Sequence, residues 1–236
     1  MTERLLLDSP ADAGAFLARV VRLDPAALVR LRPYGEGTVA LWTWLTVGAL
    51  AVRVVPGTGP ADAVVAASAL LDALGAEVAL PARRDAEWRG PLPGAGFRRL
   101  DELPADVVAG LAAAGERTFR EAAAGRSRSG ARAVTDAVLD HVAVAVTGPG
   151  AVTGPGAVTG PGAVTGPGAV TGPGAVTGPG TETADVPQRA IQALSSLGFL
   201  GADPVAVDVT AAWLRLVGTY GAVHLRRGTA LDVLAR

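Results

Sequence analysis

An α+β fold, in which helices pack on an antiparallel sheet, is the class that this sequence predicts. Short apolar runs at 27–32, 38–46 and 49–55 are separated by turns that contain Gly, which indicates an antiparallel meander. Helical signals mark other segments, including a long Ala-rich stretch after Pro104. Hydrophobic residues make up 50% of the 236-residue chain, so a sizeable core can form.

The N-terminal helix is the element with the clearest signals. Ser9 is a preferred N-cap residue, and Pro10 suits the first helical position because its missing N–H would have no partner there. Phe16 and Val20 fall on one face of the helix, and the dipeptide Asp24-Pro25 ends it.

The remaining elements are assigned from the same kinds of signal. We predict helices at 61–74, 104–124, 131–140 and 187–197, strands at 4–7, 142–146, 205–209, 212–217 and 222–226, and an extended loop at 81–104.

A perfect tandem repeat interrupts the chain between Ala145 and Gly180. The hexapeptide Ala-Val-Thr-Gly-Pro-Gly occurs six times there, without a charge or a large apolar side chain. Such a segment cannot bury a core, and its Gly-Pro-Gly units favour turns, so we predict a disordered, elastin-like loop. An elastic spacer or a partner-binding arm is one interpretation. The identity of all copies favours the other, a slippage expansion in a tolerant loop.

The repeat also sets the predicted domain boundaries. We expect an N-terminal α+β block at 1–144, the repeat at 145–180, and a C-terminal block of one helix and strands at 181–236. The two blocks either share one core or form two.

Composition indicates a GC-rich genome and excludes several kinds of site. The chain has no Lys and no Asn, and Ile191 is its one Ile, so the residues with AT-rich codons are depleted. The absence of Cys excludes disulfides, zinc–thiolate sites and a thiol nucleophile. A net charge of −1 and a pI of 6.1 lack the basic excess of a dedicated nucleic-acid binder.

No targeting or membrane-spanning segment is predicted. The N-terminal apolar run ends at Asp8, which is too early for a signal peptide. The apolar stretch at 37–52 is shorter than the roughly 20 residues of a membrane-spanning helix. We therefore expect a soluble, cytoplasmic protein.

Signals for catalysis are weak. The chain has two histidines, His141 and His224, and lacks the Gly-x-Ser-x-Gly motif of one large hydrolase class. Residues 56–60 form a Gly-rich turn between a strand and a helix, but they lack the Lys of a phosphate-binding loop. We expect no cofactor, no metal site and no catalytic residue, and we favour a protein that is not an enzyme.

Arginines provide the candidate contacts to nucleic acid. The loop after the long helix carries three, which can bind phosphate in a fork geometry. The helix at 187–197 and the strands after it resemble the element order of a winged helix, and these elements carry further arginines. The candidates are Arg126, Arg128, Arg132, Arg189, Arg226 and Arg227. Solvated surface charge is the alternative interpretation of all of them.

Trp88 is the candidate anchor for a protein partner. It lies in the predicted loop and is flanked by charged residues. Such a Trp either covers the core or contacts a partner. Trp42 and Trp44 share one face of a predicted strand and are assigned to the core.

Three segments resemble a group of actinobacterial conserved hypothetical proteins. They lie at 14–33, 85–93 and 192–201 and cover about a sixth of the chain. The resemblance implies a high-GC actinobacterial origin and carries no activity with it.

The leading functional expectation is a non-enzymatic interaction or regulatory protein that acts on an unidentified protein partner. A nucleic-acid-associated protein of winged-helix type is the alternative, and an enzyme with an unrecognised site is a third. Binding to DNA with steep salt dependence discriminates the second from the first.

Overall fold

A computed structural model describes residues 3–123, 135–148, 151–153 and 182–227, and its α+β class confirms the prediction. The chain divides into two compact units. Unit 1 takes in the described residues of 1–92, 192–203 and 218–223, and unit 2 takes in those of 93–191, 204–217 and 224–236. Both units are therefore completed by residues from the C-terminal part of the chain.

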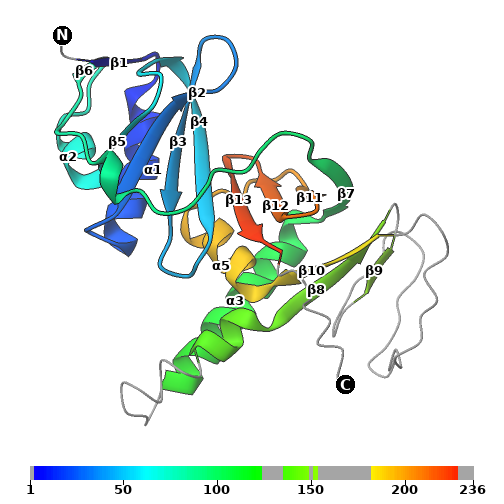
Figure 1. Cartoon of the computed structure of the whole chain (residues 1–236). Coiled ribbons are helices and arrows are strands. Elements are labelled where there is room, and N and C mark those ends of the chain that lie inside the picture. The colour runs from blue at the N-terminus through cyan, green and yellow to red at the C-terminus, as the bar shows by residue number, and fades with distance from the viewer. Residues whose placement is uncertain (1–2, 124–134, 149–150, 154–181, 228–236) are drawn as a thin grey trace, which may run out of the picture. The chain divides into compact units, whose positions relative to one another are not determined.

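The elements are labelled as in Figure 1. The helices are α1 (Pro10–Leu23), α2 (Ala67–Asp72), η1 (Asp85–Glu87, a 3₁₀ turn), α3 (Ala105–Ala123) and α5 (Gln188–Ser196), and residues 135–140 are also helical. The strands are β1 (Arg4–Leu7), β2 (Leu28–Pro33), β3 (Thr38–Trp44), β4 (Leu50–Thr58), β5 (Ala63–Ala66), β6 (Glu77–Ala79), β7 (Arg98–Leu103), β8 (Val142–Thr147), β9 (Ala151–Thr153), β10 (Thr183–Pro187), β11 (Val205–Val209), β12 (Trp213–Gly218) and β13 (Gly221–Arg226).

An antiparallel sheet in the order β5-β2-β3-β4 forms the centre of unit 1. The predicted meander is confirmed, because β2, β3 and β4 pair consecutively through short turns. β1 pairs with both β4 and β6. Figure 1 shows α1 against one face of this sheet.

Helix α1 forms where the sequence predicts it. The helix begins at Pro10, directly after Ser9, and its C-cap is Asp24. Ala13, Phe16, Leu17 and Val20 are buried, which confirms the predicted apolar face. A helix with one apolar stripe must cover that stripe, and α1 does so against β4 and α2.

Strand β3 is buried on both of its faces. Its residues from Val39 to Thr43 are all buried, although an antiparallel sheet often leaves one face to solvent. The Thr43 hydroxyl donates a hydrogen bond of 2.9 Å to the carbonyl oxygen of Leu28, so its polar group keeps a partner.

Unit 2 contains an antiparallel sheet in which β11 pairs with β7 on one side and with β12 on the other. β13 is the next neighbour of β12. A separate sheet has the order β10-β8-β9. Gln188 at the start of α5 donates a 3.1 Å hydrogen bond to the carbonyl oxygen of Leu111 in α3. A Cβ at Gly115 would lie 2.1 Å from the Gln188 amide nitrogen, so a larger residue there would force the Gln188 side chain to move.

Two predicted elements differ from the structure. Residues 63–66, predicted as helix, form β5, because pairing with β2 gives Ala63 and Val65 buried places in a sheet. The predicted loop at 81–104 contains β7, which pairs with β11. Both strands are short and gain their hydrogen bonds from partners distant in the sequence, which local patterns cannot show.

The first two repeat copies are paired with each other. Ala145, Val146 and Thr147 of β8 face Thr153, Val152 and Ala151 of β9 in antiparallel register. These residues therefore differ from the disordered loop that the sequence predicts. The copies from residue 154 onward lie outside the described residues.

Deleting residues 151–180 is expected to leave unit 2 folded, with an unchanged or higher melting temperature. The Gly148 amide already donates a 2.8 Å hydrogen bond to the Glu182 carbonyl oxygen, so Pro149, Gly150 and Thr181 can close a short hairpin between β8 and β10. A shorter loop also costs less closure entropy. Thermal unfolding followed by circular dichroism measures the effect.

Val146→Asp is the control for that deletion, because Val146 is fully buried in β8 and a charge there must destabilise the sheet. A large drop in melting temperature for the deletion itself would show that the repeat contributes to the core.

Candidate functional site

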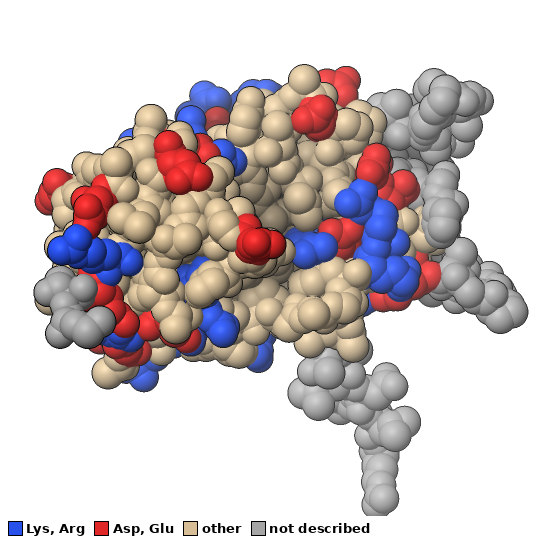
Figure 2. Space-filling view, turned by 90° about the horizontal axis from the view of Figure 1, so that it is seen from above, with Lys and Arg blue, Asp and Glu red and all other residues tan. Residues whose placement is uncertain are grey.

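Most arginines of the described residues are paired with carboxylates. The ion-paired arginines are Arg4, Arg30, Arg32, Arg53, Arg83, Arg84, Arg98, Arg99, Arg189, Arg215 and Arg227. Figure 2 accordingly shows basic and acidic side chains intermixed on the face in view, without a continuous basic surface. Any site for an anion must therefore come from the few arginines that remain.

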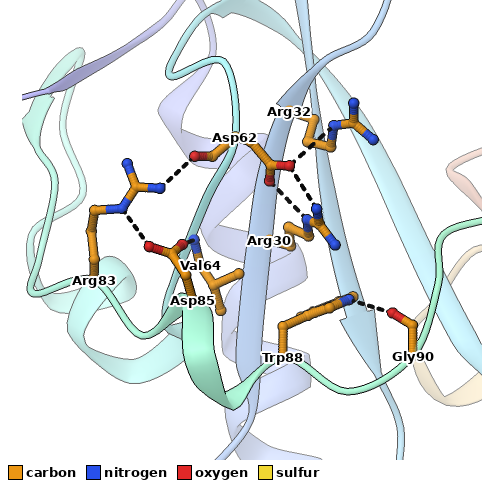
Figure 3. A network of polar contacts seen from close by, with 8 residues as sticks. All are labelled: Arg30, Arg32, Asp62, Val64, Arg83, Asp85, Trp88 and Gly90. Carbon is orange, nitrogen blue, oxygen red and sulfur yellow. Dashed lines mark hydrogen bonds and ion pairs between the residues drawn. The ribbon is translucent and has the colours of Figure 1, made fainter.

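A polar network connects β2, β5 and η1 at one edge of unit 1 (Figure 3). Arg30 donates two hydrogen bonds to the Asp62 carboxylate, of 2.7 Å from Nε and 2.6 Å from Nη2. Arg32 lies 3.7 Å from the same carboxylate. The hydrogen bond from Arg30 lowers the pKa of Asp62 below its ordinary value, because the guanidinium stabilises the charged form.

Asp85 joins η1 to β5 in the same network. Its carboxylate accepts a 2.8 Å hydrogen bond from the backbone N–H of Val64 and a 2.7 Å hydrogen bond from Arg83. The Arg83 hydrogen bond lowers the pKa of Asp85. Arg83 also donates to the Asp62 carbonyl oxygen at 2.6 Å, so these contacts hold the segment after β6 against the sheet.

Trp88 is tied into this network. Its indole N–H donates a 2.9 Å hydrogen bond to the Gly90 carbonyl oxygen, and the Arg30 guanidinium lies 5.6 Å from its ring centroid (Figure 3). The half-buried ring thus has an intramolecular role. Its use as an anchor for a protein partner stays a prediction.

Unit 2 contains a buried carboxylate. Asp208 has a side chain only 3% exposed, and both Arg99 and Arg215 donate to it, at 2.6 and 2.7 Å. Arg215 also lies over the Phe97 ring, 4.1 Å from its centroid. A register shift between Val207 and Asp208 places Asp208 opposite Arg99. Burial of one charge between two partners indicates a structural role.

Arginines on two helices have no carboxylate partner among the described residues. α1 carries Arg19 and Arg22, and α3 carries Arg117 and Arg120. Each pair has a spacing of three, which places both side chains on one side of its helix. Arg22, Arg117 and Arg120 are exposed, and Arg19 is half-buried. These residues are the best-placed cations for an anionic partner.

These four arginines are not among the six candidate nucleic-acid contacts that the sequence predicts. Arg126, Arg128 and Arg132 lie outside the described residues. Arg189 pairs with Asp140, Arg227 donates a 2.6 Å hydrogen bond to Glu182, and Arg226 lies over the Trp213 ring, 5.4 Å from its centroid. Spacing on a helix could have pointed to Arg117 and Arg120, but the carboxylates that neutralise other arginines lie far apart in sequence.

The two histidines lie in different environments. His141 is exposed at the start of β8. His224 is buried, with its ring 5.6 Å from Phe97 and 6.5 Å from Trp213 between centroids, in edge-to-face geometry. Among the described residues, no group of three or more His, Cys, Asp or Glu is placed to hold a metal ion.

None of the helices in the described part of the chain is both long enough and apolar enough to span a membrane.

Two family models match the chain and together cover nearly all of it. Domain of unknown function DUF8010 matches residues 1–90, and Domain of unknown function DUF8185 matches residues 92–166 and 168–230. The second match takes in more than half of the sequence. The chain belongs to the DUF8185 family. No protein of curated function shows detectable similarity to it.

Solved structures similar to this DUF8185 protein include β subunits and sliding clamps of DNA polymerase. The β subunit of DNA polymerase from Streptococcus pyogenes has a TM-score of 0.53 at 12% identity, over 98% of this chain and 66% of its own. Caulobacter crescentus pol III β has a TM-score of 0.50 at 12% identity, over 97% of this chain and 66% of its own. A Bartonella birtlesii DnaN sliding clamp bound to griselimycin has a TM-score of 0.50 at 14% identity, with coverage of 98% and 66%.

The likeness extends over almost the whole DUF8185 chain, which spans just under two thirds of the length of these clamps. At such low identity it shows the fold, which is clamp-like. The leading expectation of a non-enzymatic interaction or regulatory protein is wrong, because the solved structures that share this fold are DNA polymerase β subunits and sliding clamps, which favours the nucleic-acid alternative. The strands after α5 pair in a sheet with β7, so the winged-helix arrangement is replaced by the clamp-like one.

The Asp62→Asn variant is expected to lower the free energy of unfolding at neutral pH by less than about 1 kcal/mol, because the pair with Arg30 is partly exposed. The folded pKa of Asp62 lies below the ordinary 3.8, so its stabilisation is present above that pH and is lost as the pH falls through the folded pKa. Urea unfolding of both proteins at neutral and acidic pH measures the difference, which must disappear in acid.

Glu36→Gln is the matched control, since Glu36 is exposed and has no ion pair among the described residues. An Asp62→Asn effect that persists at low pH would mean that packing, rather than charge, stabilises this edge.

Proposed function

We propose that this protein is a nucleic-acid-associated protein that binds the DNA backbone without catalysing a reaction. The clamp-like fold carries the proposal, since the solved structures that share it over nearly the whole chain are named as sliding clamps or β subunits of DNA polymerase. Contacts to phosphate need cations but no base-reading groups, so the expected binding is independent of DNA sequence.

The helices supply the cations for this binding. Arg117 and Arg120 are exposed on α3 and have no carboxylate partner among the described residues, whereas most arginines of the sheets are neutralised by ion pairs. A guanidinium without a carboxylate partner is available to form charge-assisted hydrogen bonds with phosphate oxygens.

Low overall charge limits the affinity. The formal net charge is −1, so long-range attraction to DNA is absent and binding rests on local contacts. A protein with few phosphate contacts has a shallow dependence of binding on salt, about 0.9 in logarithmic slope for each contact. We therefore expect weak duplex binding that is measurable at low ionic strength.

The variant Arg117→Ala/Arg120→Ala is expected to weaken duplex binding at least tenfold at low salt, which is about 1.4 kcal/mol or more. It is also expected to reduce the salt slope by about 1 to 2, because two phosphate contacts are removed. Fluorescence anisotropy of a labelled duplex, titrated at several salt concentrations, measures both quantities.

Arg4→Ala/Arg84→Ala is the matched control. It removes the same two charges from exposed arginines that are already paired, with Glu77 and Glu87. Equal weakening by both variants would show that net charge alone governs binding. Absence of duplex binding by the unchanged protein at low salt would refute the proposed function.

A further inference from the structure

A small pocket of about 200 Å³ opens on unit 1. It lies where α1, β4, the end of α5 and the turn before β13 meet. Its main lining residues are Asp12, Phe16, Arg19, Arg53, Phe199 and Tyr220. Phe16 and Phe199 are buried and stack with ring centroids 5.8 Å apart, which gives the pocket a rigid apolar floor.

Arg53 and Asp12 neutralise each other at one side of the pocket. The Nη2 atom of Arg53 lies 2.5 Å from each carboxylate oxygen of Asp12, and the Arg53 side chain is only 16% exposed. Arg53 also donates to the Tyr220 carbonyl oxygen and lies 5.7 Å from the Tyr220 ring centroid. These contacts fix both Arg53 and the turn that carries Tyr220.

Arg19 supplies the charge that remains. It has no carboxylate partner among the described residues, so Arg19, Arg53 and Asp12 together give the pocket lining a net charge of +1. Its guanidinium lies on Gly198, where a Cβ would be 2.7 Å from the Arg19 Cζ atom. Gly198 follows α5 with φ of +65°, so the backbone favours glycine there, and a Cβ would displace the Arg19 guanidinium.

Tyr220 lines the same pocket and is presented to solvent, with the Arg53 guanidinium 5.7 Å from its ring centroid. Tyr220 is 48% exposed, although its backbone N–H donates a 3.1 Å hydrogen bond to the Phe199 carbonyl oxygen. A Cβ at Gly221 would lie 2.6 Å from the Phe199 ring, so the turn packs closely on the pocket floor. A fixed, half-exposed aromatic ring next to a cation is the combination that single-stranded nucleic acid uses for binding.

We propose that this pocket binds one nucleotide of a single DNA strand, with a phosphate at Arg19 and the base against Tyr220. The inference rests on the proposed function and adds a site for single strands to the backbone contacts of α3. The volume is below the roughly 300–1,000 Å³ of pockets that enclose a whole drug-sized ligand, so it suits one unit of a polymer. The net positive lining favours phosphate over a neutral side chain.

Binding of fluorescent oligo-dT and of a labelled duplex to the full chain tests this site. Arg19→Ala and Tyr220→Ala are each expected to weaken oligo-dT binding about tenfold, while duplex binding changes by less than about twofold. Tyr220→Phe keeps the stacking ring and is expected to bind oligo-dT as the unchanged protein does. Arg84→Ala is the control, because Arg84 is exposed, is already paired with Glu87 and does not line the pocket.

Thermal unfolding of each variant separates binding from folding. Arg19→Gln, which keeps most of the side-chain stem, replaces Arg19→Ala if the latter is unstable. Oligo-dT binding that is unchanged in both the Arg19 and the Tyr220 variants, with duplex binding intact, would overturn the site alone. Absence of duplex binding by the unchanged protein would instead overturn the proposed function.

Competition identifies the chemical class of the ligand. Thymidine monophosphate is expected to displace oligo-dT from the pocket, and an acetylated Glu-Phe dipeptide is not. Displacement by the dipeptide but not by the nucleotide would assign the pocket to a protein partner and overturn the proposal.

Discussion

Burial of central strands on both faces is the constraint on which each unit depends. β3 in unit 1 and β11 in unit 2 are buried almost along their full lengths. A polar group in such a strand needs an internal partner, because an unsatisfied buried polar group costs about 1–3 kcal/mol and a buried charge more. Thr43 in β3 is satisfied by the Leu28 carbonyl oxygen, and Asp208 in β11 by Arg99 and Arg215. The remaining buried positions are Val and Ala in β11, and Val39, Ala40, Leu41 and Trp42 in β3.

This constraint also determines which arginines are free for function. Arg99 and Arg215 form ion pairs with the buried Asp208. Arg30 of β2 forms an ion pair with Asp62, which connects β2 to the segment before β5. Sheet arginines are thus used for structure, whereas Arg117 and Arg120 on α3 keep their charge available. A protein with almost no net charge can in this way present local positive charge to a phosphate backbone.

The sequence predicts elements with local signals well and tertiary contacts poorly. The start of α1 at Pro10 and the apolar face around Phe16 are predicted from Ser9-Pro10 and from periodicity, and the structure confirms both positions, although the Ser9 side chain makes no capping hydrogen bond. β5 was beyond such reasoning because its strand state depends on pairing with β2. The pocket was missed for the same reason, since Arg19, Phe199 and Tyr220 become neighbours only through folding. The clamp-like fold itself depends on the pairing of strands that are distant in the sequence, such as β7 with β11, which local patterns do not show.

Arginine-specific labelling with phenylglyoxal, with and without DNA, tests whether the α3 arginines contact the duplex. Every one of the 21 basic residues is Arg, so the reagent reports on all of the basic side chains in one experiment. The account predicts that duplex DNA protects Arg117 and Arg120 from modification while Arg4 and Arg84, already paired with carboxylates, keep the same reactivity. Equal labelling of Arg117 and Arg120 with and without DNA, at concentrations where the duplex is bound, would contradict it.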